Sequence, residues 1–344
     1  MKKLLNTLFV TQHGTYLHKV RETVSVELGD TKLLQVPTLA LSNIFCYGRV
    51  SISPQLMQHC VTNNIGIAFF SEYGRFQARV VGSKSGNVFL RREQYRIADD
   101  ETRCVQIAKN MVGAKIVNSR SVLAKTIRNR PEAEGKDELL AACNNMKSTL
   151  KRLAGDALLD RLRGREGEAA NSYFAVFDHL ISQQKQDFHF HNRNRRPPAD
   201  PVNALLSFVY ALLLQDCVSA LEGVGLDSYV GFLHRDKPGR QGLALDLIEE
   251  FRSVVGDRLC LSLINLKQLQ RADFSFKENG AVLLSDSARK LVLQEYQKRK
   301  QETILHPVIQ ENVKIGLLFH VQALLLARHI RGDIDYYPAF LWRS

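Results

Sequence analysis

The sequence has few of the residues that hold small secreted or metal-stapled folds together. Its six cysteines are scattered over 344 residues, and no two of them form a Cys-x-x-Cys pair. This spacing argues against a zinc cage and against a disulfide framework. No segment approaches the roughly 18 consecutive apolar residues that a membrane span needs. We therefore expect reduced thiols, a cytoplasmic location and no membrane partner.

Acidic residues are scarce relative to basic ones. The chain has 47 Lys and Arg against 35 Asp and Glu, a net charge of +12, and residues 1–97 carry +7 of it. Such a balance fits a nucleic-acid partner, although general solubility explains it equally well. With 45% hydrophobic and 24% charged residues, the composition is that of a folded protein and excludes wholesale disorder.

The first hundred residues have the pattern of a β domain. Short segments rich in β-branched and aromatic residues alternate with turn signals, which favours a small sandwich or sheet. One helix is expected at Ser53–Asn63. The expected strands are Leu4–Val10, Tyr16–Val20, Thr23–Leu28, Thr31–Pro37, Gly66–Phe70 and Phe76–Val81.

Beyond residue 99, apolar residues recur with the period of a helix. The expected helices are Glu101–Asn118, Ser119–Asn129, Lys136–Leu162, Glu166–Ser182, Pro201–Leu221, Leu243–Val255, Ser285–Gln301 and Pro307–His329. The predicted fold class is therefore α+β, with a small N-terminal β domain at 1–97 and a larger all-α domain at 98–344. A looser alternative boundary lies at residues 82–87.

Two stretches concentrate basic residues. Residues 111–130 contain no acid, and residues 189–196 form a second basic stretch before a proline-rich loop. Phosphate contact and a solvated helix face both explain such stretches. At 100° per residue the cations of 111–130 do not form one stripe, so we expect two helices joined near residues 118–120. The candidate DNA-binding residues are Lys115, Arg120, Lys125, Arg128, Arg193, Arg195 and Arg196.

Three segments place acids and a histidine beside glycine and other small residues. Glu166 is expected at a helix start, His234 follows an apolar segment, and Asp246 and Glu249 are three apart on one expected helix. Each has a structural explanation: a helix-dipole contact, a hydrogen-bonded histidine, or an ion pair with Arg252. Together they form a ligand set that suits Mg²⁺ or Mn²⁺. In a basic protein, such a site suggests phosphodiester chemistry.

Four sequence blocks, in order and spacing, resemble the CRISPR-associated integrase family, the Cas1 spacer-acquisition nucleases. The resemblance extends over the whole chain, and the long loop at 193–201 resembles the type I-C subtype. The blocks are Glu-Gly-x-Ala-Ala-x-x-Tyr-Phe at 166–174, Arg-Pro-Pro-x-Asp-Pro-x-Asn-Ala-Leu-Leu-Ser at 196–207, Gly-Phe-Leu-His at 231–234 and Gly-Arg-x-x-Leu-Ala-Leu-Asp-Leu-x-Glu at 239–249.

The resemblance implies a function and a ligand set. It places the metal on Glu166, His234 and the Asp246/Glu249 pair, with general acid catalysis as an alternative role for His234. It implies a homodimer formed through the β domain, two such dimers on a dimer of the small protein Cas2, and double-stranded DNA as substrate. The implied reactions are metal-dependent cleavage and transesterification, by which a DNA 3′-hydroxyl attacks a phosphodiester at the end of a repeat.

Two further residues and two rival functions complete the sequence-based hypotheses. Asn203 and Tyr210 are seven apart, on one helical face, and are candidates to support the metal ligands. Core packing explains Tyr210 equally well. A branched-DNA repair nuclease and a non-catalytic DNA-binding scaffold are the rivals. The cluster of acids with a histidine speaks against the scaffold.

Overall fold

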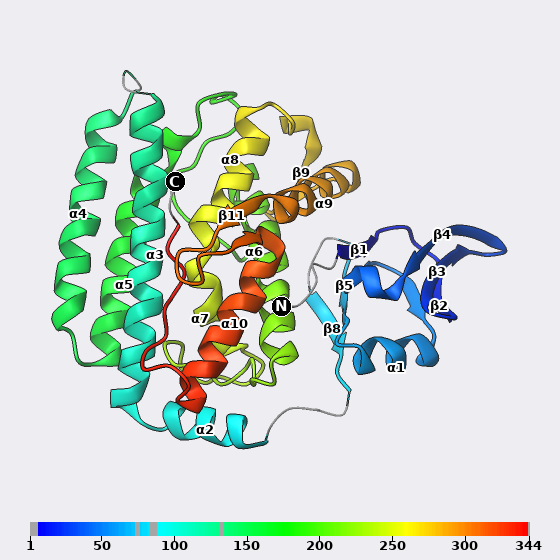
Figure 1. The fold of residues 1–344 in the computed structure, drawn as a ribbon. Helices are drawn as coiled ribbons and strands as arrows, with labels where there is room; N and C mark the ends of the chain where they lie inside the picture. Colours follow the sequence, from blue (N-terminus) through cyan, green and yellow to red (C-terminus); the bar gives the residue numbers. More distant parts are fainter. Residues whose placement is uncertain (1–5, 73–75, 83–87, 131, 133, 343–344) are drawn as a thin grey trace.

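The structure is a computed structural model that describes residues 6–72, 76–82, 88–130, 132 and 134–342. Figure 1 shows the N-terminal strands on one side of a larger helical body, which confirms the predicted α+β class. The last strand of the N-terminal region ends at Val80, and helix α2 (Val88–Ala98) packs against the helical body. The domain boundary at 97/98 stays a prediction, and the alternative at 82–87 falls mostly outside the described residues.

The N-terminal region contains two four-stranded sheets, with strand orders β1-β5-β7-β8 and β4-β3-β2-β6. Helix α1 (Pro54–Thr62) begins after Ser53, whose hydroxyl accepts a hydrogen bond from the Leu56 amide. The strands are β1 (Asn6–Val10), β2 (Thr15–Val20), β3 (Thr23–Leu28), β4 (Thr31–Pro37), β5 (Leu41–Tyr47), β6 (Val50–Ile52), β7 (Gly66–Phe70) and β8 (Phe76–Val80).

The six expected strands and the helix are confirmed in type, but β5 and β6 were missed. Strand β5 lies between β1 and β7 and pairs in parallel with both. A strand buried on two sides lacks the alternation of polar and apolar residues that identifies a half-exposed strand. The expected strand at Leu4–Val10 begins at Asn6, and its first two residues lie outside the described residues.

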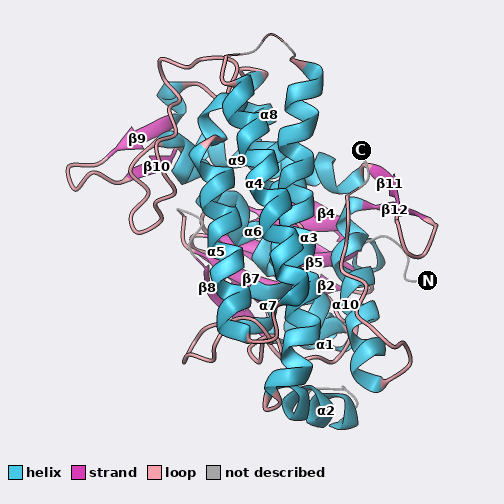
Figure 2. Ribbon diagram, turned by 90° about the vertical axis from the view of Figure 1, so that its left-hand side faces the viewer, coloured by secondary structure: helices cyan, strands magenta, loops and turns pink. Residues whose placement is uncertain are grey.

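The helical body contains α3 (Glu101–Asn129), α4 (Lys136–Gly155), α5 (Leu159–Ala175), α6 (Pro201–Gly223), α7 (Gly242–Leu247), α8 (Arg258–Asn265), α9 (Asp286–Gln301) and α10 (Ile315–Arg331). Short helical turns join them at η2 (Phe177–Leu180), η3 (Ile248–Glu250), η4 (Arg252–Asp257) and η5 (Arg271–Asp273), and η1 (Thr38–Ala40) lies in the β region. Figure 2 shows these helices wound around a common interior, with the two strand pairs at the periphery. The pairs are β9 (Phe274–Phe276) with β10 (Val282–Leu284), and β11 (Thr303–Leu305) with β12 (Asn312–Lys314).

Helix α3 is one continuous helix of 29 residues, so the predicted break near residues 118–120 is wrong. Asn and Ser commonly favour caps because their side chains bond nearby backbone. Here the Asn118 amide instead donates to the carbonyls of Glu250 and Phe340, 2.8 Å away in each case. Long-range hydrogen bonds thus replace the local ones that would have ended the helix.

Other expected boundaries are also wrong. The helix expected at Lys136–Leu162 ends at Gly155, and α5 begins at Leu159. Glu166 lies in the interior of α5, whose packing against α3 and α4 outweighs the helix penalty of Gly164 and Gly167. The expected helix at 243–255 is divided into α7, η3 and the π-helical segment η4. The segment 303–314 forms β11 and β12 before α10 begins.

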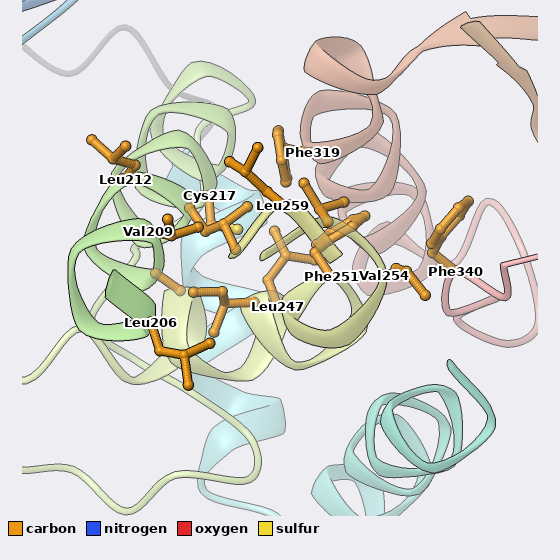
Figure 3. Close-up of a cluster of buried hydrophobic side chains, with 14 of the residues drawn as sticks. Leu206, Val209, Leu212, Cys217, Leu247, Phe251, Val254, Leu259, Phe319 and Phe340 are labelled. Atoms are coloured by element: carbon orange, nitrogen blue, oxygen red, sulfur yellow. The ribbon is translucent and has the colours of Figure 1, made fainter. Parts of the chain in front are cut away.

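A continuous hydrophobic core fills the helical body. In Figure 3, side chains of α6 and of the segment 247–259 meet Phe319 and Phe340 from the C-terminal part of the chain. Helix α6 is long and apolar enough to cross a membrane by length and composition. However, 72% of that apolar window is buried inside the protein, as in the core helix of a globular fold.

Candidate active site

A lysine joins two of the predicted acidic residues. The Lys115 ammonium, on α3, contacts Glu166 Oε1 of α5 and lies 2.8 Å from Glu249 Oε2 of η3. The other oxygen of Glu249 lies 2.8 Å from the Arg252 guanidinium. Glu249 is only 2% exposed. Residues far apart in the sequence therefore converge because α3, α5 and η3 pack together.

The charge state of Glu249 follows from this arrangement. Desolvation by burial would raise the pKa of its carboxyl group. The nearby Arg252 and Lys115 charges outweigh that effect and lower the pKa to about 2. Glu249 is thus ionised at neutral pH and is held as a carboxylate in the interior.

Asp246 fixes the backbone and the ring of the segment that ends in His234. Its Oδ2 accepts hydrogen bonds from the amides of Phe232, at 2.6 Å, and Leu233, at 2.9 Å. Its Oδ1 accepts one from the His234 amide at 3.0 Å and lies 2.5 Å from His234 Nδ1. A Cβ on Gly231 would lie 2.8 Å from Asp246 Oδ2, so this close approach requires glycine.

This geometry separates the roles of the two predicted carboxylates. Both oxygens of the fully buried Asp246 are engaged by the loop, whereas Glu249 faces Lys115 and Arg252. In the tautomer in which His234 Nδ1 donates to Asp246, the lone pair lies on Nε2, which a metal ligand or a base requires. Asp246 as a direct ligand stays a prediction, and the hydrogen bonds favour Glu249 for that position.

Glu166, His234 and Glu249 line one open cavity of about 1200 Å³. Cations surround them on its walls: Arg163, Arg195, Arg196, Arg235, Lys237, Arg240 and Arg252. The predicted Arg195 and Arg196 are among them. The other cations were not predicted to line a site, although Arg252 was expected as an ion-pair partner of Glu249; they come from α5, from the loop before α7 and from η4. A cavity with this charge suits a phosphodiester strand.

The donor set fits a divalent ion, although its members are not gathered around one point. Within the described residues, no three His, Cys, Asp or Glu side chains lie close enough to hold a metal. The Lys115 ammonium occupies the space between the two glutamates. Glu249 Oε2 is buried and lies 2.8 Å from the Lys115 ammonium, so a metal ion at this oxygen would take the place that Lys115 now occupies. Mn²⁺ binds both carboxylate and imidazole ligands, whereas Mg²⁺ prefers the carboxylate oxygens.

Neither of the two residues predicted to support the ligands contacts a predicted ligand directly. Asn203 is buried, and its Oδ1 accepts hydrogen bonds from the Arg193 guanidinium at 2.7 Å and the Asn194 amide at 3.1 Å. The Tyr210 ring lies 5.4 Å from each of the Arg193 and Arg252 guanidinium carbons. Tyr210 thus touches Arg252, the partner of Glu249.

Asp257, at the end of η4, was not singled out from the sequence. It accepts hydrogen bonds from the hydroxyls of Tyr210, at 2.6 Å, and Tyr173, at 3.0 Å. Burial raises the pKa of Asp257 to about 6. A π-helical turn carries both Arg252 and Asp257, and no local pattern predicts such a turn.

The basic residues of α3 lie partly beside the acidic residues of the site and partly further along the helix. Lys115 lies inside the site, whereas Lys125 and Arg128 lie further along the helix and do not line the cavity. Arg193 is turned toward Asn203. DNA contact by each of these residues stays a prediction.

The C-terminal segment is fastened beside the site through Glu250. Its carboxylate accepts hydrogen bonds from the Tyr337 hydroxyl and the Phe340 amide, both 2.6 Å away, and from Gln322 at 2.9 Å. Burial raises the pKa of Glu250 from 4.5 to about 7 in spite of these bonds. The turn that carries Glu249 is therefore tied to the end of the chain.

The raised pKa of Glu250 predicts a pH-dependent stability. The folded state binds this proton more tightly than the unfolded state, so its contribution is fully present below pH 4.5 and is lost as the pH rises toward 7. A pKa shift of this size changes the free energy of unfolding by about 3 kcal/mol at most. Glu250→Gln should remove this pH dependence of the free energy of unfolding, which urea unfolding measures between pH 4.5 and 7. A difference profile between wild type and variant that is independent of pH would contradict the assignment.

Comparison with known proteins identifies close relatives of the whole chain. A family model described as CRISPR associated protein Cas1 matches residues 8–298. A CRISPR-associated endonuclease Cas1 of Chlorobaculum tepidum is 48% identical over 343 residues and covers 100% of both chains. A second Cas1 endonuclease, from Rhodospirillum rubrum, is 47% identical over 347 residues, again with 100% of both chains covered.

Solved structures share the fold at lower sequence identity. A CAS1 protein from Thermotoga maritima has a TM-score of 0.81 at 22% identity, covering 95% of this chain and 97% of its own. A casposase bound to its integration product has a TM-score of 0.84 at 21% identity, covering 98% and 95%. These similarities extend over both the β region and the helical body.

Proposed function

Because the chain belongs to the Cas1 family of CRISPR-associated proteins, we propose that it is a metal-dependent DNA endonuclease and integrase of CRISPR adaptation. The observation that carries this proposal is the basic cavity into which Glu166, His234 and Glu249 all face. Its relatives from Chlorobaculum tepidum and Rhodospirillum rubrum are named endonucleases, and a casposase with an integration product has the same fold. The protein would act in the cytoplasm.

Each residue of the cavity has a role in the proposed reaction. Glu166, Glu249 and His234 Nε2 would hold Mg²⁺ or Mn²⁺, which when bound supplies a Lewis acid at the scissile phosphate. Asp246 holds the His234 ring and its proton in place. The cations of the cavity wall would position the phosphodiester strand, so that a DNA 3′-hydroxyl or a water attacks in line.

Two partners are proposed in addition to double-stranded DNA. Strand β4 is a sheet edge and exposes Leu33 and Leu34, and Leu39 that follows it is 82% exposed. Exposed apolar side chains on a sheet edge are suited to pairing with a second copy, which supports a homodimer formed through the β region. The family resemblance supports Cas2 as the second partner, and the loop at 193–201 supports the type I-C subtype.

The proposed function is tested with purified protein, a Cas2 partner and a DNA fragment with free 3′ ends. In the presence of Mn²⁺, we expect the fragment to join covalently to a plasmid that carries a repeat, and we expect chelation to stop the reaction. Cleavage of branched DNA without joining would favour the repair nuclease. DNA binding without either reaction would favour the scaffold.

A further inference from the structure

A second group of cations lies outside the cavity, where α3, α8 and α9 meet the end of the chain. We propose that Lys125, Arg128, Arg258 and Arg299, together with Trp342, form a separate binding site for the phosphate backbone of duplex DNA. This inference rests on the proposed function, because it assumes that DNA is the substrate. It adds a contact that lies beyond the site of chemistry.

These cations have few counterions. Among the described residues, Arg299 pairs with Glu302, whereas no ion pair is formed by Lys125, Arg128 or Arg258. One guanidinium nitrogen of Arg258 and Nε of Arg299 are buried and have no hydrogen-bond partner in the described part of the chain. Buried donors without acceptors are unfavourable, and an anion with several oxygens would satisfy them.

The cations also lie close enough to repel one another. The Arg258 charge is the largest cause that lowers the pKa of Lys125, followed by burial and by the charges of Arg128 and Arg299. Burial lowers the pKa of Arg258, and the Arg299 charge lowers it further. Like charges held together in a folded protein destabilise it unless an opposite charge is bound. A phosphate supplies that charge at this point.

Trp342, the single tryptophan of the chain, orders two of these cations. The guanidinium carbons of Arg258 and Arg299 lie 5.0 and 5.7 Å from its ring centroid. The Trp342 amide donates to Asn118 Oδ1 at 2.8 Å, and Phe340 is held by Glu250. The end of the chain is thus fastened to α3 and presents a rigid surface for the two arginines.

The position of the cluster favours DNA as its ligand. Lys115, which contacts Glu166 and Glu249, and Lys125 in the cluster are ten residues apart on α3, about 15 Å along the helix axis. Arg252 lines the cavity, and Arg258 follows six residues later in the same run of helical turns. The elements that build the active site therefore also carry the cluster, and a duplex of about ten base pairs is long enough to reach both.

The test compares two double charge reversals that change the net charge equally. Lys125→Glu with Arg128→Glu alters the cluster, and Lys147→Glu with Lys151→Glu alters exposed residues of α4 as the matched control. Affinity for a duplex of about 30 base pairs is measured by fluorescence anisotropy over a range of salt concentrations. We expect about tenfold weaker binding for the cluster variant at physiological salt. The slope of the logarithm of the affinity against the logarithm of the salt concentration should be smaller in magnitude by about two. The control should bind within about twofold of wild type.

A second variant addresses the buried part of the cluster. Arg258→Gln removes the charge and keeps a shorter polar side chain. Circular dichroism checks that the variant folds, and we expect the folded variant to bind DNA more weakly than the wild type. Equal affinity in the cluster and control variants would overturn the proposal while leaving DNA binding by the wild type intact. Loss of Cas2 binding with unchanged DNA affinity would instead assign the cluster to a protein partner. Failure of the wild type itself to bind DNA would reject the proposed function as well.

Discussion

Glu249→Gln is expected to reduce metal-dependent DNA cleavage by about a thousandfold or more, and Glu166→Gln should do the same. Glutamine keeps the shape of the side chain but lacks the charge that a hard divalent ion requires. Single-turnover cleavage with Mn²⁺ measures the rate, and electron paramagnetic resonance measures the bound ion. Glu168→Gln is the matched control, because Glu168 lies on the same helix and pairs with Arg152 away from the cavity.

The same substitution at Glu249 has a second expected effect, on stability. If the carboxylates were simply clustered, removing one would relieve repulsion and stabilise the metal-free protein. The structure instead places Lys115 and Arg252 on either side of Glu249, so its removal leaves the largely buried Arg252 without its ion-pair partner and leaves Lys115 with Glu166 alone. We expect a loss of about 3 kcal/mol or more in the free energy of unfolding. Stabilisation of the metal-free Glu249→Gln protein would show that Lys115 does not pair with Glu249 in solution.

Asp246→Ala is expected to abolish cleavage and also to lower the free energy of unfolding by about 4 kcal/mol. The substitution leaves the amides of Phe232, Leu233 and His234 buried without their acceptor and frees the imidazole ring. His234→Ala should abolish cleavage as well but keeps these three backbone bonds, so its stability should change by only about 1 kcal/mol.

Urea unfolding and cleavage assays on both variants separate the two roles. A fully stable Asp246→Ala protein with weakened Mn²⁺ binding would identify Asp246 as a ligand rather than as the residue that positions His234. Equal losses of stability in the two variants would show that the backbone hydrogen bonds of Asp246 contribute little.

The sequence by itself determined the fold class and most of the elements. Helix α6 begins where Asp200 and Pro201 predict, with the Asp200 carboxylate accepting a hydrogen bond from the Asn203 amide at 2.7 Å. Six strands and helix α9 also lie where alternation and helical period place them. Local signals are sufficient for these elements because propensity, capping and packing all agree. The four sequence blocks likewise indicated the family, and the residues that they predict for the site stay a prediction.

Only the tertiary structure decided what those residues contact. The continuity of α3 depends on bonds from Asn118 to Glu250 and Phe340, which are more than 130 residues away. Lys115 appeared in the sequence as one cation in a basic stretch, and the packing of α3 against α5 and η3 places it between Glu166 and Glu249. The difference between Asp246 and Glu249 also arises only in three dimensions. Both are carboxylates on one short segment, and the neighbours that each one meets come from elsewhere in the chain.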